Sequence, residues 1–144
     1  MKTIKHTHIG AYAIIINNNK IALIKKAIGA YTGKYDLPGG GIEHTETPLQ
    51  ALHRECKEEI DATVIKEKLL DVTSVNVTWN IKEDLEEDLH HIGILYEVKI
   101  KETKLKDTPD GIDSNGGLWI DINKLSQKNT SPFVWHSLKL LGYI

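Results

Sequence analysis

Three glutamates between residues 55 and 59 are the side chains of this sequence whose type and spacing could do chemistry. Glu55, Glu58 and Glu59 occupy positions i, i+3 and i+4, so a helix would place them on one face. Like charges at this spacing destabilise a helix by roughly a few tenths of a kcal/mol per pair, unless a divalent cation lies among them. Carboxylate oxygens suit Mg²⁺ or Mn²⁺, and Mg²⁺ takes further ligands from water and substrate phosphates. The residues therefore predict a metal site for a phosphorylated ligand.

The segment that must position these glutamates has the start and stop signals of a helix. Thr47 is a favourable N-cap, and Pro48 suits the first helical position because no partner is required for its missing N–H. Asp61 stands at the expected C-terminal end, where its short polar side chain tolerates left-handed backbone. Apolar residues recur at helical spacing beside the acidic face and predict the side that packs in the core: Leu49, Leu52, Cys56 and Ile60.

A rigid entry and three glycines precede this helix. Leu37 and Pro38 are followed by Gly39, Gly40 and Gly41. Glycine permits unusual backbone dihedral angles and a close approach of the backbone to a ligand. Exposed backbone groups in such a loop can bind a metal ion or a phosphate. We therefore expect Gly40 and Gly41 to contact substrate.

The glycines and the acidic helix together resemble the Nudix box. In that motif a glycine, a glutamate, an Arg-Glu pair, a bulky apolar residue, a Glu-Glu pair, a glycine and a second bulky apolar residue recur at fixed spacing. Asp61 stands where the family has its second glycine, which affects the end of the helix rather than the carboxylates. The remaining positions match in register: Gly40, Glu46, Arg54, Glu55, Cys56, Glu58, Glu59 and Ala62.

The resemblance implies roles for these residues. Arg54 would orient a glutamate through a bidentate contact, and Glu46 would stabilise the junction between loop and helix. Glu55 would be either a metal ligand or the base that activates water. The predicted catalytic residues are Arg54, Glu55 and Glu58. The predicted metal ligands are the carbonyl of Gly39 and the carboxylates of Glu55, Glu58 and Glu59. A solvated helix face with surface ion pairs is the alternative interpretation.

A further acidic ligand could come from a distant loop. Relatives of this kind place a glutamate directly before a late tryptophan, but Leu118 precedes Trp119 here. We select Asp113 as the candidate replacement, although most acids in these loops are expected to be solvated. The candidates are Glu86, Glu87, Asp88, Asp110 and Asp113.

Aromatic, imidazole and lysine side chains near these segments are candidates for substrate binding. Tyr35 and Trp79 are our choices to stack against a base, and Tyr12 is a third possibility; burial in the core or rim is the alternative for each. One of His90 and His91 could face the cleft, although a structural histidine is the commoner case. Either of two consecutive lysines could meet a phosphate: Lys25 and Lys26.

The composition indicates an ordinary globular protein. A chain of 144 residues with 40% apolar and 26% charged residues suits one domain over residues 1–144. A net charge of −2 gives no electrostatic reason to expect a nucleic acid polymer as a partner. One cysteine, no long apolar run and no apolar stretch at the N-terminus lead us to expect a cytoplasmic protein without a membrane segment, as a monomer or homodimer.

The pattern along the chain predicts strands around the main helix. Residues 9–16, 20–26, 64–79, 90–100 and 118–122 have the composition of strands, and residues 131–141 that of a helix that begins at Ser131 and Pro132. Residues 80–88 are strongly acidic and predict a solvated loop, and residues 101–117 a polar one. This agrees with the fold that the resemblance implies, an α/β/α sandwich with a mixed sheet between helices.

The sequence therefore predicts a Mg²⁺-dependent pyrophosphohydrolase for a nucleoside diphosphate linked to another group. The compact single domain and the segment Glu46-Thr47-Pro48 resemble the MutT-like branch of the family, which implies a nucleoside triphosphate, oxidised or not, as the preferred substrate. ADP-ribose, another nucleotide sugar and a dinucleoside polyphosphate are the alternatives, because the proline or tyrosine that marks many such enzymes is absent from residues 75–80, where Trp79 stands. Two further classes stay open: a non-catalytic nucleotide sensor, and a plain α/β protein with a coincidental acidic helix.

Overall fold

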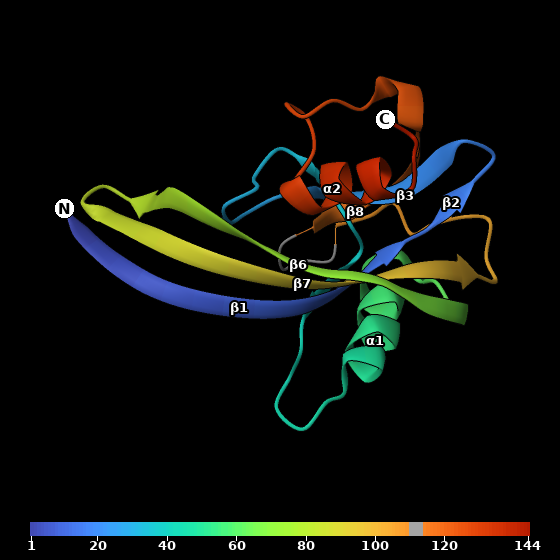
Figure 1. Ribbon diagram of the computed structural model, residues 1–144, viewed down its shortest axis with the longest axis horizontal. Helices are drawn as coiled ribbons and strands as arrows, with labels where there is room; N and C mark the ends of the chain where they lie inside the picture. Colours follow the sequence, from blue (N-terminus) through green and yellow to red (C-terminus); the bar gives the residue numbers. More distant parts are fainter. Residues whose placement is uncertain (110–113) are drawn as a thin grey trace.

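The computed structural model describes residues 1–109 and 114–144, which form two sheets and two α-helices (Figure 1). The strands are β1 (Lys2–Ile14), β2 (Ile16–Asn17), β3 (Lys20–Lys26), β4 (Tyr35–Asp36), β5 (Gly39–Gly41), β6 (Val64–Lys82), β7 (Leu85–Ile100) and β8 (Ser114–Asp121). The helices are α1 (Pro48–Ile60), the short 3₁₀ helix η1 (Ile122–Lys124) and α2 (Pro132–Leu140).

The larger sheet is mixed and has the strand order β5-β1-β7-β6. Strands β1 and β7 are parallel, while β5 and β6 pair antiparallel with β1 and β7 respectively. The smaller sheet has the order β2-β3-β4, and β8 pairs with β3. Because β5 carries the three glycines, the glycine loop is fixed to the edge of the larger sheet.

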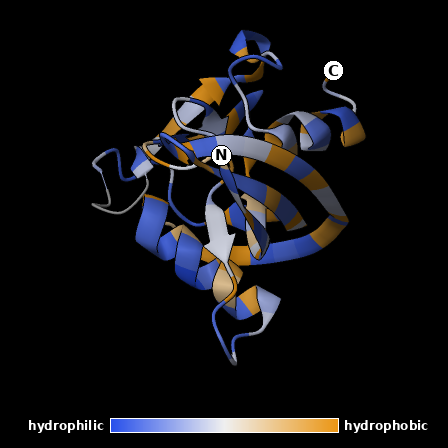
Figure 2. Ribbon diagram, turned by 90° about the vertical axis from the view of Figure 1, so that its left-hand side faces the viewer, coloured by the Kyte–Doolittle hydropathy of each residue, from blue (hydrophilic) through white to orange (hydrophobic). Residues whose placement is uncertain are grey.

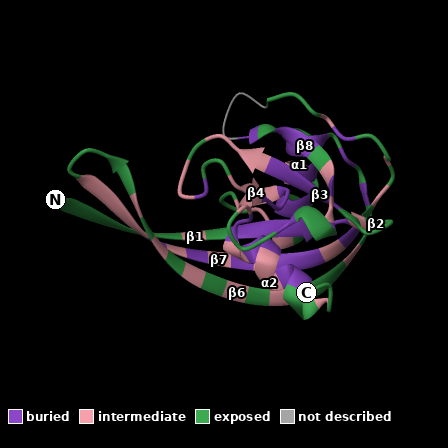
Figure 3. Ribbon diagram, turned by 90° about the horizontal axis from the view of Figure 1, so that it is seen from above, coloured by how far each residue is buried: buried purple, intermediate pink, exposed green. Residues whose placement is uncertain are grey.

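Two apolar clusters hold the layers together. One surrounds Leu52, Cys56 and Ile60 of α1, and the other surrounds Phe133 and Leu138 of α2. Both clusters draw residues from β1, β3 and β7, so the sheets lie between the two helices (Figures 1 and 3). Leu49 was predicted to belong to the packed face of α1, but it is 39% exposed; Ala51 and Glu59 are buried there instead.

A three-stranded outer ribbon extends from the body of the protein (Figure 1). We define it as residues 2–9 of β1, 74–82 of β6 and 85–92 of β7, which are paired by register apart from a shift between Asn80 and Lys82. The prediction of a solvated loop over residues 80–88 was wrong, because β6 and β7 continue to Lys82 and from Leu85 and join through a tight turn in which Asp84 has φ 62°. The acidic residues alternate between the two faces of this hairpin, so their charge does not prevent a strand.

The remaining boundaries differ from expectation mainly by length. β1 begins at Lys2 rather than residue 9, and β8 begins at Ser114. Residues 64–82 form one long strand, although one or two were possible from the sequence. Along residues 74–82 of β6, apolar and polar residues alternate, as expected for a strand with unlike faces; Figure 2 colours the chain by hydropathy. Among the described residues, no helix is long and apolar enough to cross a membrane.

Candidate active site

Thr47 caps the start of α1, as the sequence predicted, and it does so within a capping box. The Thr47 hydroxyl accepts a hydrogen bond from the Gln50 N–H at 3.1 Å, and the Gln50 side chain accepts one from the Thr47 N–H at 2.9 Å. Pro48 occupies the first turn, and Asp61 ends the helix in the left-handed conformation, at φ 52° and ψ 43°. Both helix ends therefore follow from local sequence, and they set the direction of the acidic face.

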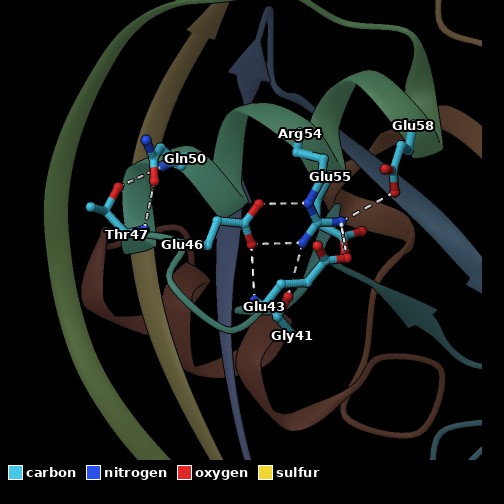
Figure 4. A network of polar contacts seen from close by, with 8 residues as sticks. All are labelled: Gly41, Glu43, Glu46, Thr47, Gln50, Arg54, Glu55 and Glu58. Carbon is cyan, nitrogen blue, oxygen red and sulfur yellow. Dashed lines mark hydrogen bonds and ion pairs between the residues drawn. The ribbon is translucent and has the colours of Figure 1, made fainter.

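Arg54 connects the helix to the loop before it (Figure 4). Its Nε and Nη2 donate to the two carboxylate oxygens of Glu46 at 2.7 and 2.9 Å, and Nη2 also donates to the Gly41 carbonyl at 3.1 Å. The hydrogen bonds from Arg54 lower the pKa of Glu46 to about 2 and raise the pKa of Arg54. A planar guanidinium matches a carboxylate in this way, so loop and helix are held in one relative position.

The same guanidinium reaches two of the three clustered glutamates. Its Nη1 donates to Glu55 at 2.9 Å and to Glu58 at 3.3 Å. The Glu55 side chain is 15% exposed and that of Glu58 is 54% exposed. Arg54 therefore offsets part of the repulsion between these carboxylates, and Glu58 keeps the greatest freedom to move.

Glu59 is held differently, from the glycine loop. It is only 3% exposed, and one carboxylate oxygen accepts the Gly39 N–H at 2.7 Å. Gly39 has φ 140°, and a Cβ there would collide with the Ala11 carbonyl oxygen. This position therefore requires glycine, and its N–H holds the Glu59 carboxylate in place.

Gly40 and Gly41 need to be glycine for a different reason, which is the lack of space for a side chain. Neither has a positive φ, so the unusual dihedral angles expected of this loop belong to Gly39 among the three. A Cβ on Gly40 would lie 2.7 Å from a carboxylate oxygen of Glu55, and one on Gly41 would lie 2.8 Å from the His8 ring. The loop backbone thus passes directly against a glutamate and an imidazole.

These groups open into one cavity of about 600 Å³. The box wall consists of Gly39, Gly40, Gly41, Glu55, Glu58 and Glu59. The ribbon wall consists of His6, His8, Trp79, Glu87, Leu89 and His91, all from one face of the outer ribbon. A third side is formed by residues 28–31 with Lys26, Asp36 and Lys106. The structure thus brings Trp79, Gly40 and Gly41 to the same cavity as the glutamates.

Glu87 is the member of the ribbon wall that carries a charge of its own. The Trp79 indole N–H donates to one of its oxygens at 2.8 Å, and Nδ1 of His6 lies 3.1 Å from the other. Of the five acids considered as an extra ligand, Asp110 and Asp113 lie outside the described residues. Glu86 and Asp88 accept hydrogen bonds from the side chains of Thr3 and Asn76, respectively. Neither is among the residues that line the cavity.

His91 occupies the inner end of the ribbon wall and is 5% exposed. Burial, with smaller contributions from His8 and Lys26, lowers its pKa to about 3. Both ring nitrogens contact tyrosine hydroxyls, Tyr12 at 2.6 Å and Tyr31 at 2.9 Å. Tyr31 had no motif or periodicity to mark it in the sequence, because only the fold brings residues 31 and 91 together.

Tyr35, predicted to bind substrate, is not among the residues that line this cavity. Tyr35 belongs to β4, and the Lys25 ammonium lies over its ring, 4.4 Å from the ring centroid. Tyr35 borders a separate depression together with Leu118 and Trp119. Alternation along the short strand explains the difference: the next residue, Asp36, points to the cavity side and is 4% exposed. Asp36 accepts hydrogen bonds from Ser131 and the Leu37 N–H.

The box wall offers the oxygen ligands that a hard divalent cation prefers. All of its charged groups are carboxylates, and Gly40 leaves the space beside Glu55 that a Cβ would fill. In residues 1–109 and 114–144, no group of three or more His, Cys, Asp or Glu side chains is placed to hold a metal ion by itself. Mg²⁺ is usually bound by one or two carboxylates, waters and substrate phosphates, so an open arrangement of this kind fits it.

Residues 6–141 match the family model of the NUDIX domain, so this chain belongs to the Nudix family. It is 37% identical over 71 residues to an 8-oxo-dGTP diphosphatase of Proteus vulgaris, covering 49% of this chain and 63% of that protein. It is 32% identical over 120 residues to an ADP-ribose pyrophosphatase of Methanocaldococcus jannaschii, covering 83% of this chain and 65% of that protein. The chain thus spans less than two thirds of the length of these curated relatives.

Solved structures show the same architecture. The MutT NUDIX hydrolase from Burkholderia pseudomallei superposes with a TM-score of 0.75 at 21% identity, covering 94% of this chain and 98% of that one. The predicted Nudix fold, a mixed sheet between helices, is therefore confirmed.

Proposed function

We propose that this protein is a Mg²⁺-dependent pyrophosphohydrolase that cleaves a nucleoside triphosphate to a nucleoside monophosphate and pyrophosphate. The observation that carries the proposal is the box wall: three glutamates and a glycine loop, fixed by Arg54 and Glu46, that open into a cavity lined on its other side by indole and imidazole rings. The diphosphatase and pyrophosphatase relatives support the reaction class.

The carboxylates are proposed to hold the metal and to activate water. Glu59, fixed by the Gly39 N–H, and Glu58 are the proposed ligands together with Glu55 and the Gly39 carbonyl. A bound Mg²⁺ would supply charge neutralisation at the phosphate oxygens and a lowered pKa for water. Glu55 and Glu58 are the two candidates for the base that accepts the proton, and Glu58 is the more exposed of the two.

The chain's other groups would orient the substrate. Arg54 holds Glu55 and Glu58 in place and therefore acts on the reaction through them. Trp79, fixed by its hydrogen bond to Glu87, offers an indole ring against which a base can stack. Lys106, whose ammonium donates to the Glu58 carbonyl at 3.3 Å, is a cation at the rim that can attract phosphates.

The direct test is turnover with a panel of nucleotides. We expect dGTP or 8-oxo-dGTP to give monophosphate and pyrophosphate with Mg²⁺ or Mn²⁺, resolved by chromatography, and no product with EDTA. The same panel includes ADP-ribose, because the longer of the two alignments is with an ADP-ribose pyrophosphatase, and a dinucleoside polyphosphate. Tight nucleotide binding without any turnover would instead indicate a sensor, and the proposed activity would be wrong.

A further inference from the structure

Three side chains in the cavity form one hydrogen-bonded row, Tyr12–His91–Tyr31. The Tyr12 hydroxyl lies 2.6 Å from Nε2 of His91, and the Tyr31 hydroxyl lies 2.9 Å from Nδ1. All three line the cavity, and each is at most 6% exposed. The row joins β1, the loop before β4, and β7, so it exists only in the folded protein.

This row holds more protons than its own hydrogen bonds can use. Burial and the nearby Asp36 carboxylate raise the pKa of Tyr12 and of Tyr31, so both hydroxyls stay protonated. A neutral His91 carries one N–H. The row then has three donor protons, two on hydroxyls and one on the ring, but only two hydrogen bonds, so one hydroxyl proton is not used within the row. With a protonated imidazole, two hydroxyl protons would not be used. At least one hydroxyl proton is therefore available whether His91 is neutral or charged.

The two distances favour one tyrosine as the owner of the unused hydroxyl proton. Hydrogen bonds donated by a hydroxyl are on average shorter than those donated by an N–H, about 2.7–2.8 Å against about 2.9–3.0 Å to an oxygen acceptor. The 2.6 Å contact therefore fits Tyr12 as donor to Nε2, and the 2.9 Å contact fits Nδ1–H as donor to Tyr31. In the part of the chain that the structure describes, the Tyr31 hydroxyl makes no hydrogen bond other than this one. Its O–H is available to a molecule in the cavity.

The surroundings of this donor favour a neutral acceptor. The Tyr31 ring stacks on His91, with centroids 5.6 Å apart and planes at 23°. His8 lies 5.3 Å from His91, and burial lowers its pKa, which favours the uncharged ring. The Asp36 carboxylate is near enough to raise the pKa of Tyr31 and would repel a phosphate oxygen. A nucleobase presents neutral oxygen and nitrogen acceptors on a flat ring and meets none of this repulsion.

We propose that Tyr31 is a specificity-determining residue whose hydroxyl donates a hydrogen bond to an acceptor atom of the substrate's nucleobase, with His91 and Tyr12 as positioning residues. The inference rests on the proposed nucleotide-hydrolysing function. It assigns the base to the side of the cavity where the outer ribbon meets residues 28–31, with the phosphates at the box wall.

The test compares Tyr31→Phe on a nucleotide and on a substrate without a base. With dGTP, we expect kcat/KM to fall about three- to tenfold, which corresponds to one neutral hydrogen bond. With inorganic tripolyphosphate, we expect no change. Tyr35→Phe is the matched control, because Tyr35 lies outside this cavity, and it should behave as wild type with both substrates. Adding Tyr12→Phe to Tyr31→Phe should cause no further loss, since Tyr12 acts through the row.

Three results would overturn the inference. Equal losses on dGTP and tripolyphosphate would place the acceptor in the phosphate chain. Unchanged kinetics on both would show that Tyr31 does not contact substrate, and a loss in Tyr35→Phe would show a general effect. Calorimetric measurement of dGTP binding tests the Tyr31 contact independently of the proposed hydrolysis. If wild type binds dGTP without turnover, a Kd raised about three- to tenfold in Tyr31→Phe still supports the contact. An unchanged Kd contradicts it.

Discussion

The box wall and the ribbon wall face the same cavity but are assembled in opposite ways. In the box wall, Arg54 contacts Glu46 at a separation of 8 residues and Gly39 contacts Glu59 at 20. In the ribbon wall, His6 contacts Glu87 at a separation of 81 residues, and His91 contacts Tyr12 at 79. One wall is a short continuous segment, whereas the other exists only because two distant strands pair.

The two walls also differ in charge, and this suggests a division of work. The box wall carries carboxylates that would hold a metal and accept a proton. The ribbon wall carries rings and a single carboxylate that is already engaged by Trp79 and His6. We therefore expect substitutions in the box wall to change kcat and substitutions in the ribbon wall to change KM.

The largest effect is expected from Glu59→Gln. Glutamine keeps an oxygen for the Gly39 N–H but removes the charge. We expect kcat to fall by at least about a hundredfold, the order of loss found when one group that stabilises transition-state charge is removed, with an unchanged melting curve. The matched control is Glu83→Gln on the exposed turn of the hairpin. Near-normal turnover of Glu59→Gln would show that the buried glutamate is structural.

A smaller effect, of a different kind, is expected from Glu87→Gln. Glutamine replaces one carboxylate oxygen with an NH2 group and removes the charge, so the hydrogen bond that orients the indole becomes a weaker, uncharged one. We expect KM to rise about three- to tenfold, the order of the difference between a charge-assisted and a neutral hydrogen bond, while kcat changes little. Glu86→Gln is the matched control, since the neighbouring residue is not among those that line the cavity. A large fall in kcat with KM unchanged would instead make Glu87 part of the catalytic set.

Acid should weaken the ribbon wall and the Arg54–Glu46 contact that supports the box wall over different pH ranges. The pKa of His91 is lowered from 6.5 to about 3, so the unfolded chain takes up a proton first, and stability is lost as pH falls from 6.5 toward 3. The pKa of Glu46 is lowered from 4.5 to about 2, so its stabilising effect is complete above pH 4.5 and disappears toward pH 2.

Chemical denaturation at a series of pH values tests both windows. Relative to wild type, His91→Phe should have a flatter stability profile between pH 6.5 and 3. Glu46→Gln should differ from wild type most above pH 4.5, and the difference should shrink below it. Parallel profiles for all three proteins would show that neither group is linked to folding in this way.

The smallest effect is expected from Asp61→Gly at the end of α1. Asp61 has φ 52°, where a Cβ is unfavourable by roughly 1–2 kcal/mol in general, although the short polar side chain of Asp tolerates this region better than most. The substitution also removes the ion pair with Lys57, whose ammonium lies 2.9 Å from the carboxylate on the exposed surface. We expect a slight net gain in the free energy of unfolding and unchanged kinetics. Lys57→Gln removes the ion pair alone, and a clear loss in Asp61→Gly but not in Lys57→Gln would reveal another contact of Asp61.

The helix and its caps could be predicted because their causes are local. Thr47, Pro48 and Asp61 act on backbone within one turn of themselves, so their positions follow from the order of residues. The outer ribbon could not be predicted with the same tools. Residues 80–88 look like a solvated acidic loop when their charge is considered over the whole segment. In a strand, however, alternate residues lie on opposite faces, so the same charges do not all lie together.

The candidate site divides along the same line. The glutamates, Arg54 and the glycines were recognisable from spacing, although the reason for glycine at positions 40 and 41 is the proximity of Glu55 and His8. Tyr35 and Tyr31 have similar local surroundings in the sequence, and nothing there distinguishes the residue that faces the cavity. That distinction depends on which strand each one packs against.

The sequence by itself determined the family, the acidic helix with both of its ends, and the carboxylates available for a metal. These depend on residues within about one helical turn or one loop of each other, where covalent connection already limits the geometry. Only the tertiary structure decided that Glu87, rather than Glu86 or Asp88, lines the cavity, and that His91 lies between Tyr12 and Tyr31. Those choices depend on the register of β1 against β7, and a shift of one residue would turn every side chain of the ribbon to the other face.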